Sequence, residues 1–249
     1  MPRNMHKWED LRPEEFLAEQ SRAPVVYWAC GPMEDHGLQN ALGIDPCKAY
    51  EICLRAAEKT GGIVFPLVPL APAGAPPLSR AEMRSGSHEL FPPSLFVSVE
   101  LCRQAYEELF ENMAELGFRV CAAFGGHGPA AGLLKKIAEE LDGKLVDMQI
   151  FTCGSTTFTH DLILADGASD PSPCSHGGKW ETSMNMALNT EYVDLSRVRD
   201  IEDSPIPSQL KGRAEGTLQA IEASSADFGE RLIETAACRL AETVRELLG

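Results

Sequence analysis

The sequence predicts an α/β fold with a largely parallel central sheet. Short apolar runs alternate along the chain with segments of helical periodicity, and polar clusters directly follow two of these runs. Alternation of strands and helices is the pattern of parallel sheets, in which each crossover between neighbouring strands carries a helix. We find no internal repeat and no low-complexity block in the 249 residues.

The apolar runs are the predicted strands. The first run, PVVYWAC, combines β-branched and aromatic residues and ends at Gly-Pro, which is typical of a buried strand. Prolines break the second run, and the third leads directly into GGHGPAAG. The predicted strands are 24–30, 62–70, 118–124 and 143–151.

Helices are predicted between and after these strands. Asp45 suits an N-cap and Pro46 a first helical position, so a helix should open there and stop at Gly61 and Gly62. Another helix should start near Pro129. The remaining predicted helices are 10–20, about 98–116, 181–188 and the C-terminal segment 225–247.

Two long segments are predicted to be loops. Residues 71–94 are rich in proline, glycine and serine, and residues 152–176 form a polar stretch that includes His160 and Asp161. Loops of this length are usually functional or mobile. We therefore expect both segments to shape a pocket.

Composition limits the classes of partner. The chain is 44% hydrophobic and 24% charged, with a formal net charge of −15, which disfavours nucleic acid and anionic membrane surfaces. Its length suits one large domain or two small ones. The eight cysteines form no CxxC pair, and no apolar run reaches the roughly 18 residues of a membrane span. The N-terminus is charged, so we expect a cytoplasmic protein with reduced thiols.

The polar clusters after the first and third predicted strands contain potential metal ligands. Glu34 and His36 are two residues apart and would share one side of an extended segment, with Asp45 nearby. His127 follows the third strand between glycines. Ligands of parallel sheets bind at the carboxyl ends of strands, so these side chains should converge. They suit zinc, manganese or iron, and one carboxylate could bridge two ions.

Each of these residues also has an ordinary structural interpretation. The EDHG segment would serve as a solvated turn, Asp45 as a helix cap and His127 as a turn residue. Glu181 would interact with the dipole of the helix that it begins. Their joint placement at one sheet edge is what favours a functional site.

The order of these motifs resembles the creatininase family, also called creatinine amidohydrolases. The first motif resembles Gly-x-x-Glu-x-His-Gly followed by an Asp nine positions after the His, and the second is a Gly-His-Gly turn after a strand. The third resembles His-x-Gly-x-x-Glu-Thr-Ser. The matching residues are Gly31, Glu34, His36, Gly37, Asp45, Gly126, His127, Gly128, His176, Gly178, Glu181, Thr182 and Ser183.

The resemblance spans most of the chain and implies a single three-layer α/β/α domain over residues 1–249. It implies two divalent metal ions (Zn, Mn or Fe), held by Glu34, His36, Asp45 and His127, with Asp45 as the bridge. His176 would be the catalytic proton donor. The resemblance also implies a homo-oligomer, commonly a hexamer, and a small-molecule substrate. Gly128 and Trp180 are further candidates for contact with that substrate.

Three departures from the family pattern matter. Many members place a Glu two residues after the His of the second motif, where this chain has Pro129. Glu181 is our candidate for the missing carboxylate ligand. Asp35 occupies the position between Glu34 and His36 where the family usually has a Gln. The proline-rich segment 71–94 does not match the corresponding segment of creatininases. Creatinine itself is therefore not the expected substrate.

The sequence thus predicts a metal-dependent amidohydrolase that hydrolyses a non-peptide C–N bond, such as that of a cyclic amide or formamide, with a metal-bound hydroxide. The alternative is a non-catalytic metal-binding or scaffold relative on the same fold, which Pro129 motivates. A third interpretation is a thiol enzyme that uses Cys30 or Cys174, although no base stands at a characteristic spacing from either residue.

Overall fold

A computed structural model describes residues 3–145 and 147–249 of the chain. Its sheet has four strands in the order β2-β1-β3-β4, and every neighbouring pair is parallel. The prediction of an α/β fold with a largely parallel sheet is confirmed. The strands are β1 Val25–Cys30, β2 Ile63–Val64, β3 Val120–Gly125 and β4 Gln149–Gly154.

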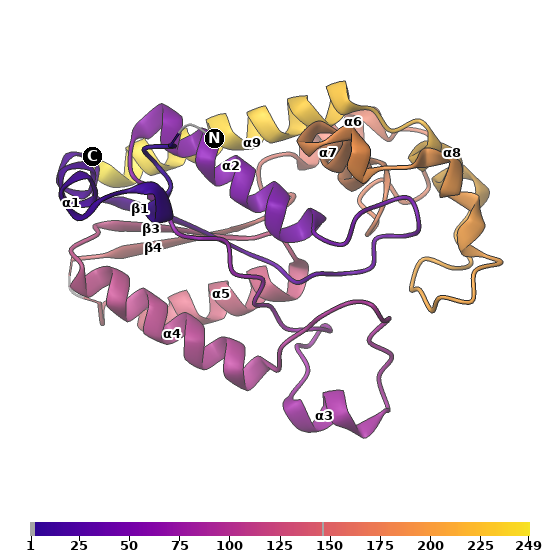
Figure 1. Ribbon diagram of the computed structural model, residues 1–249, viewed down its shortest axis with the longest axis horizontal. Coiled ribbons are helices and arrows are strands. Elements are labelled where there is room, and N and C mark those ends of the chain that lie inside the picture. The colour runs from indigo at the N-terminus through magenta and orange to yellow at the C-terminus, as the bar shows by residue number, and fades with distance from the viewer. Residues whose placement is uncertain (1–2, 146) are drawn as a thin grey trace.

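Helices cover both faces of this sheet (Figure 1). Helices α2 and α9 lie on one side, and α4 and α5 lie on the other, which gives the three layers implied by the family resemblance. The α-helices are α1 Pro13–Arg22, α2 Ile44–Thr60, α3 Arg80–Ser85, α4 Val99–Glu115, α5 Gly128–Leu141, α6 His160–Asp166, α7 Lys179–Leu188, α8 Glu215–Glu222 and α9 Ala226–Leu248.

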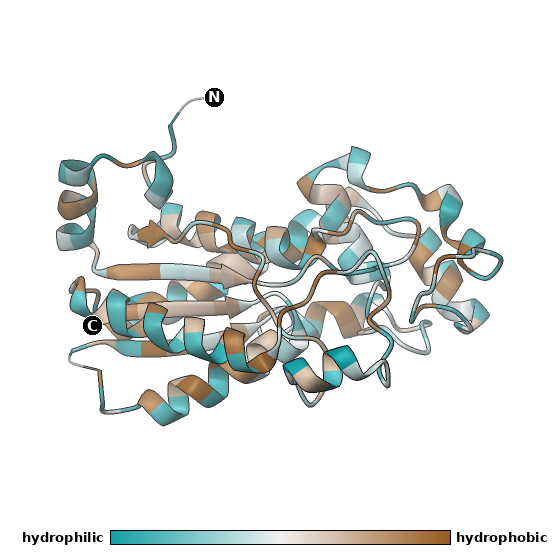
Figure 2. Ribbon diagram, turned by 60° about the horizontal axis from the view of Figure 1, so that its bottom comes forward, coloured by the Kyte–Doolittle hydropathy of each residue, from teal (hydrophilic) through white to brown (hydrophobic). Residues whose placement is uncertain are grey.

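Strand β1 divides its side chains between two hydrophobic cores. Tyr27 belongs to the core beneath α2 and α9, while Val26 and Trp28 belong to the core beneath α4 and α5. This alternation follows from the two-residue period of a strand, and burial of both faces explains why the strand is apolar throughout. Figure 2 shows mainly hydrophobic or neutral colours along the strands, which lie between helices of mixed hydrophobic and hydrophilic residues.

Two predicted strands are shorter than expected. Strand β2 has only two residues, because Pro66 cannot donate the N–H that a longer ladder requires. Strand β4 begins at Gln149 rather than at residue 143, since Lys144 N–H bonds to Leu141 O and continues the turn after α5. Residue 146 of this predicted strand lies outside the described residues.

Both predicted loops contain a short helix. Ser79 caps α3 within the 71–94 segment by accepting a hydrogen bond from Glu82 N–H, and α6 occupies residues 160–166 of the second segment. Helix α8 was not among the predicted elements. Helix α2 begins at Ile44 with Gly43 as its N-cap, so the prediction that Asp45 caps this helix is wrong. Asp45 lies inside the first turn, and its side chain points to other partners.

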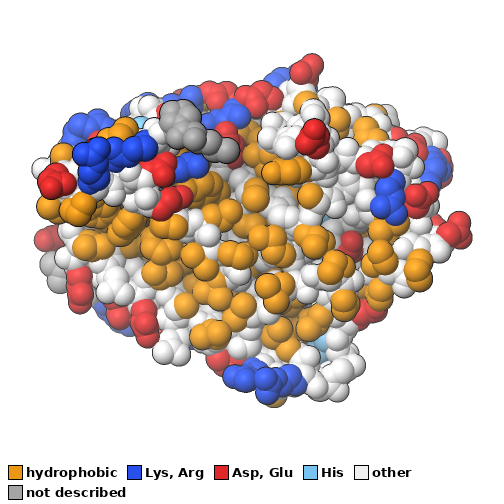
Figure 3. Space-filling view, in the orientation of Figure 1, with side chains coloured by type: hydrophobic (Ala, Val, Ile, Leu, Met, Phe, Trp, Pro, Cys, Tyr) orange, Lys and Arg blue, Asp and Glu red, His pale blue; other side chains and the backbone are white. Residues whose placement is uncertain are grey.

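Hydrophobic side chains cover the middle of the molecular face seen in Figure 3, and most charged side chains gather nearer its rim. Val68 and Leu95 are among the large hydrophobic residues that stay exposed. Within the described residues, no helix combines the length and hydropathy of a membrane span.

Candidate metal centre

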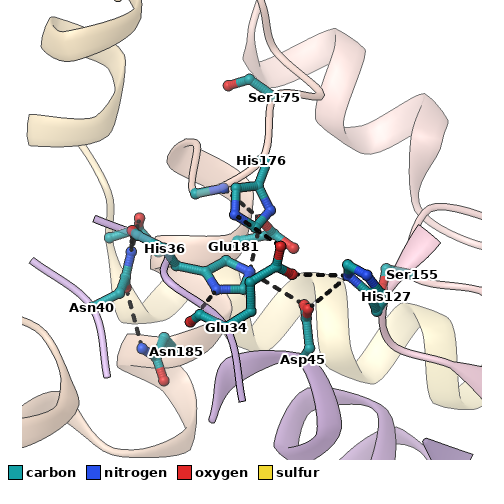
Figure 4. Close-up of polar contacts among 12 residues, drawn as sticks. Glu34, His36, Asn40, Asp45, His127, Ser155, Ser175, His176, Glu181 and Asn185 are labelled. Carbon is teal, nitrogen blue, oxygen red and sulfur yellow. Dashed lines mark hydrogen bonds and ion pairs between the residues drawn. The ribbon is translucent and has the colours of Figure 1, made fainter. Parts of the chain in front are cut away.

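Six ionisable side chains from separate parts of the chain meet beyond the carboxyl ends of β1 and β3 (Figure 4). Two come from the segment after β1, one from the start of α2, one from the turn after β3, and two from the segment that enters α7. We call them the acid–imidazole cluster: Glu34, His36, Asp45, His127, His176 and Glu181. The prediction that the polar motifs share one sheet edge is confirmed.

One group within the cluster consists of Glu34, Asp45 and His127, and we call it the first position. His127 Nδ1 lies 2.9 Å from Glu34 Oε2 and 3.3 Å from Asp45 Oδ2. Gly126 makes this approach possible, because a Cβ atom there would lie 2.0 Å from the backbone oxygen of Asp45. The glycine before His127 therefore lets the end of β3 contact the start of α2.

A second group consists of His36, Asp45 and Glu181, and we call it the second position. His36 Nε2 lies 3.3 Å from Asp45 Oδ1 and 3.5 Å from Glu181 Oε2. His36 Nδ1 lies 3.0 Å from the backbone oxygen of Glu34, to which it can donate a proton. That hydrogen bond directs the lone pair of Nε2 at the two carboxylates, as is common for metal-binding histidines.

The cluster meets the main test for a cation site, because buried polar atoms normally have hydrogen-bond partners. Four of its side-chain atoms are buried and have no such partner among residues 3–145 and 147–249. They are Glu34 Oε2, His36 Nε2, Asp45 Oδ2 and His127 Nε2. Carboxylate oxygens and imidazole nitrogens are ligands of zinc, manganese and iron, so the donor set fits such an ion.

The two less exposed imidazoles of the cluster, His36 and His127, have raised pKa values in the cation-free protein. Burial lowers the pKa of His36, but Asp45 and Glu181 outweigh this effect and raise it well above the ordinary value. Burial also lowers the pKa of His127, but Asp45 and Glu34 raise it to about 9. Each imidazole must lose its proton to bind a metal, so cation binding near neutral pH releases protons.

The carboxylates of the second position share a buried cation. Lys48 is fully buried, and its Nζ donates to Asp45 Oδ1 at 2.6 Å and also to Glu181 Oε1. Burial lowers the pKa of Lys48, but the two carboxylates raise it to about 12. Burial raises the pKa values of Asp45 and Glu181, yet Lys48 and then His36 bring both below their ordinary values. These groups are charged at neutral pH.

His176 is the most exposed member of the cluster, with 28% of its side chain accessible. Its ring centroid lies 4.1 Å from that of His36, and its Nε2 lies 2.8 Å from the backbone oxygen of Asp35. Nδ1 lies 3.9 Å from Glu181 Oε2. His176 thus stands between the buried carboxylates and solvent, where a proton can be exchanged.

A network of amides holds the loop of His36 against α7. Asn40 Nδ2 donates to the backbone oxygen of His36 at 2.9 Å and to Thr182 Oγ1 at 3.0 Å. Asn185 Nδ2 donates in turn to Asn40 Oδ1 at 3.2 Å. Since Glu181 lies on the same helix as Thr182 and Asn185, this network helps to set the distance between His36 and Glu181.

Besides Asn40 and Asn185, sequence reasoning missed four further residues at the site. Ser208 donates to Asp35 Oδ2, Gln209 donates to Glu34 Oε1 at 3.2 Å, and Arg213 donates to the backbone oxygen of His176. All three precede α8 in a segment without a recognisable motif. The fourth residue, Lys48, lies three positions after Asp45 in a helix and therefore on the same helical face, which is a signal in the sequence.

Ser94, at the end of the proline-rich segment, and the two residues that follow it lie against the site. Ser94 Oγ accepts a hydrogen bond from Asp35 N–H at 2.9 Å, and Leu95 N–H bonds to Met33 O. The ring of Phe96 lies 6.1 Å from that of His127. These contacts place the segment directly beside the first position.

The two predicted substrate-contact residues differ in their surroundings: Gly128 has open space beside it, and Trp180 is buried. Gly128 begins α5, and a Cβ atom there would meet no atom within 4 Å. Trp180 is only 5% exposed, its Nε1 donates to Ser175 O, and its ring lies 4.9 Å from Lys48 Nζ. Contact of either residue with a substrate stays a prediction.

The two thiols considered above lack the environment of a catalytic cysteine. Burial raises the pKa of Cys30 to about 12. Cys174 is exposed, and its Sγ lies 3.7 Å from His160 Nδ1, but burial and then the charge of Asp170 raise its pKa as well. Reactive thiols have lowered pKa values, so this geometry disfavours the thiol-enzyme interpretation.

A buried carboxylate and imidazole cluster at the carboxyl edge of a parallel sheet defines an α/β protein with a candidate dinuclear metal centre. The family model described as creatinine amidohydrolase, Creatininase, matches residues 9–244. The chain therefore belongs to the creatininase family. It is 23% identical over 238 residues to the creatinine amidohydrolase of Pseudomonas putida, a match that covers 89% of both chains.

Solved structures have the same fold. A crystal structure of creatinine amidohydrolase has a TM-score of 0.75 and 20% identity, with 97% of each chain covered. The structure named "Creatininase Mn" has a TM-score of 0.74 and 22% identity over 97% of this chain and 98% of that one. A creatininase mutant of the "Zn-Zn type" has a TM-score of 0.74 and 21% identity over 96% and 97%.

Proposed function

We propose that the protein is a metal-dependent amidohydrolase that cleaves a non-peptide C–N bond of a small molecule. The observation that carries this proposal is the set of buried donor atoms without partners in the acid–imidazole cluster. Family membership supports it, and the named manganese and zinc forms of creatininase indicate which cations those relatives hold. Zinc, manganese and iron all suit the donors of this chain.

In this proposal, two neighbouring cation positions share one carboxylate. Glu34 and His127 would hold an ion at the first position, His36 and Glu181 at the second, and Asp45 would bridge them. Pro129 offers no side-chain ligand, and Glu181 supplies the carboxylate of the second position. The chemistry that divalent cations supply when bound is polarisation of a carbonyl group and a lowered pKa of water, toward about 7.

A side chain of the cluster must also protonate the leaving nitrogen. His176 is proposed to give a proton to the leaving nitrogen, because it is the cluster imidazole most open to solvent. The hydrogen bond from His176 to the backbone oxygen of Asp35 fixes the imidazole ring, and Ser208 in turn donates to the carboxylate of Asp35. Arg213 binds the backbone oxygen of His176. These contacts orient the imidazole before a substrate arrives.

The substrate class follows from the surroundings of the cluster. Phe96 lies beside His127, shortly after the proline-rich segment 71–94 that differs from the family pattern. We therefore propose a small cyclic amide or formamide other than creatinine. Assembly as a homo-oligomer, a hexamer by resemblance, and a cytoplasmic location stay predictions, as does one domain spanning residues 1–249.

The test combines metal analysis with hydrolysis of a panel of cyclic amides and formamides. His127→Ala should lose both bound metal and turnover. His176→Ala should keep its metal and lose turnover by about 10²–10⁴-fold, the usual contribution of a general acid. His160→Ala removes an imidazole outside the cluster and should match the wild type.

Three outcomes would contradict parts of this proposal. Full metal content in His127→Ala would remove that residue from the ligand set. Unchanged turnover in His176→Ala would exclude it as the proton donor. Tight metal binding by the wild type without hydrolysis of any panel member would favour the non-catalytic scaffold.

A further inference from the structure

Lys48 is a buried cation in direct contact with proposed metal ligands. It lies on α2 with no accessible surface, and its ammonium group contacts Asp45, Glu181 and the ring of Trp180. A lysine is seldom fully buried unless opposite charges surround it. Both carboxylates that surround Lys48 belong to the second position.

The two cation positions therefore differ in their charge. At the second position, Lys48 donates to an oxygen of each carboxylate. At the first position, Glu34 Oε2 and Asp45 Oδ2 face His127 and have no hydrogen-bond partner among the described residues. A cation at the second position would lie close to an ammonium group, whereas a cation at the first position would meet two carboxylate oxygens that no lysine or arginine contacts and that lack a hydrogen-bond partner among the described residues.

The charge of the whole cluster leads to the same conclusion. Metal-binding imidazoles are neutral, so three carboxylates against one ammonium group leave a charge of −2. Pro129 adds no further carboxylate. Farther out, the opposite charges of Asp35 and Arg213 cancel. One divalent cation thus neutralises the cluster, and a second would leave excess positive charge in a buried place, which is costly.

We propose that Lys48 makes the two positions unequal, so that the chain holds one divalent cation tightly at the first position and a second one much more weakly. The ammonium group of Lys48 offsets one of the two carboxylate charges of the second position, in place of a tightly bound ion. Lys48 is in this sense a positioning residue that sets metal stoichiometry. The inference rests on the metal binding proposed above, but not on any catalysed reaction.

The experiment measures binding of Zn²⁺ and of Mn²⁺ to the metal-stripped full-length protein, by calorimetric titration and by elemental analysis after dialysis. The wild type should retain one equivalent per chain, with a second weaker by on the order of 100-fold. Lys48→Met keeps a side chain of similar length without its charge. In that variant the second equivalent should tighten at least about tenfold.

Lys135→Met is the matched control, because Lys135 is exposed on α5 and pairs only loosely with Glu139 at 3.9 Å. It should titrate like the wild type. Two equally tight equivalents in the wild type would overturn the inference alone, even if Lys48→Met does not fold. An unchanged second equivalent in a folded Lys48→Met protein would also overturn it. Retention of no cation by the wild type would overturn the metal proposal and this inference with it.

Discussion

Carboxylates form ion pairs both in the acid–imidazole cluster and on the surface of the molecule, but the two kinds of pair differ in their exposure to water. On the surface, Arg199 bridges Glu215 and Glu222, and every partner keeps at least 36% of its side chain accessible. In the cluster, His127 pairs with Glu34 and Asp45, and none of the three exceeds 10%. Water can replace a partner on the surface but not in the cluster.

The difference shows where the fold leaves polar groups for a ligand. Surface pairs contribute little to stability because solvent screens them and ordering long side chains costs entropy. Buried charges without enough partners are unfavourable for folding unless a bound ion compensates them. Buried atoms without a hydrogen-bond partner among the described residues, such as Glu34 Oε2 and Asp45 Oδ2, therefore indicate binding rather than stabilisation. The following predictions test this contrast, starting with the largest effect.

Replacing Asp45 should have the largest effect, because its two oxygens face both positions. Asp45→Asn removes the shared charge and leaves Lys48 with one carboxylate. We expect metal affinity and turnover to fall by at least about 100-fold, more than the loss of a residue that merely supports a ligand. Metal analysis and panel assays measure this.

The same substitution on the surface is the control for Asp45. Asp161 pairs with Arg239 at 2.7 Å, but 59% of its side chain is accessible. Asp161→Asn should keep the metal content and turnover of the wild type. Equal losses in the two variants would contradict the contrast between buried and exposed charges.

Metal removal should have the next largest effect, this time on stability. A ligand present at 100 times its dissociation constant stabilises the native state by about 3 kcal/mol. For a domain of this size, chelation should therefore lower the midpoint of thermal unfolding by roughly 5–10 °C. Calorimetry with and without chelator measures the shift, and re-added cation should reverse it. A thermal unfolding midpoint that changes neither with chelator nor with re-added cation would contradict the presence of a resident ion.

The metal-free protein should also lose stability as the pH rises. The pKa of His127 is raised to about 9 against an ordinary value near 6.5, so its contribution is fully present below pH 6.5. That contribution is lost as the pH rises through about 9, and His36 shifts in the same direction. Deprotonation of His127 should lower the free energy of unfolding by up to roughly 3 kcal/mol.

Urea unfolding of both forms between about pH 6 and pH 9.5 tests this effect. In the loaded protein the coordinated imidazoles are already neutral, so the decline should be confined to the metal-free form. The stability difference between the two forms should widen with pH. A metal-free protein with equal stability at both ends of the range would contradict the role of these imidazoles.

The sequence allowed prediction of the parts of the fold that local pattern controls. The β1 run is apolar because both of its faces are buried, and α9 has apolar residues at helical spacing because one side packs mainly against α2 and α7. Strand β4 was misjudged at its start because it is an edge strand with an exposed Gln149. Helix α8 was missed because its apolar residues, including Leu218 and Ile221, are few and pack on a small separate core.

The same distinction between local pattern and tertiary packing applies to the residues of the candidate site. Glu34, His36 and Asp45 lie within one short segment, so their spacing and the strand before them predicted a common location. Ser208 and Gln209 reach the same place from more than 170 residues away. Only tertiary structure brings that segment to the cluster. Lys48 could have been recognised as a charged residue on the buried face of α2, but its contact with Glu181, which is distant in the sequence, could not.

The smallest predicted effect concerns the surface network. Arg199→Gln removes the charge that joins Glu215 to Glu222, but leaves both carboxylates in water rather than buried and unpaired. The unfolding midpoint should change much less than on chelation, and any difference should vanish in about 1 M salt, where the screening length is near 3 Å. Thermal scans of variant and wild type at low and high salt measure this. A salt-insensitive loss as large as that on chelation would show that this exposed network stabilises the fold as strongly as a bound ion.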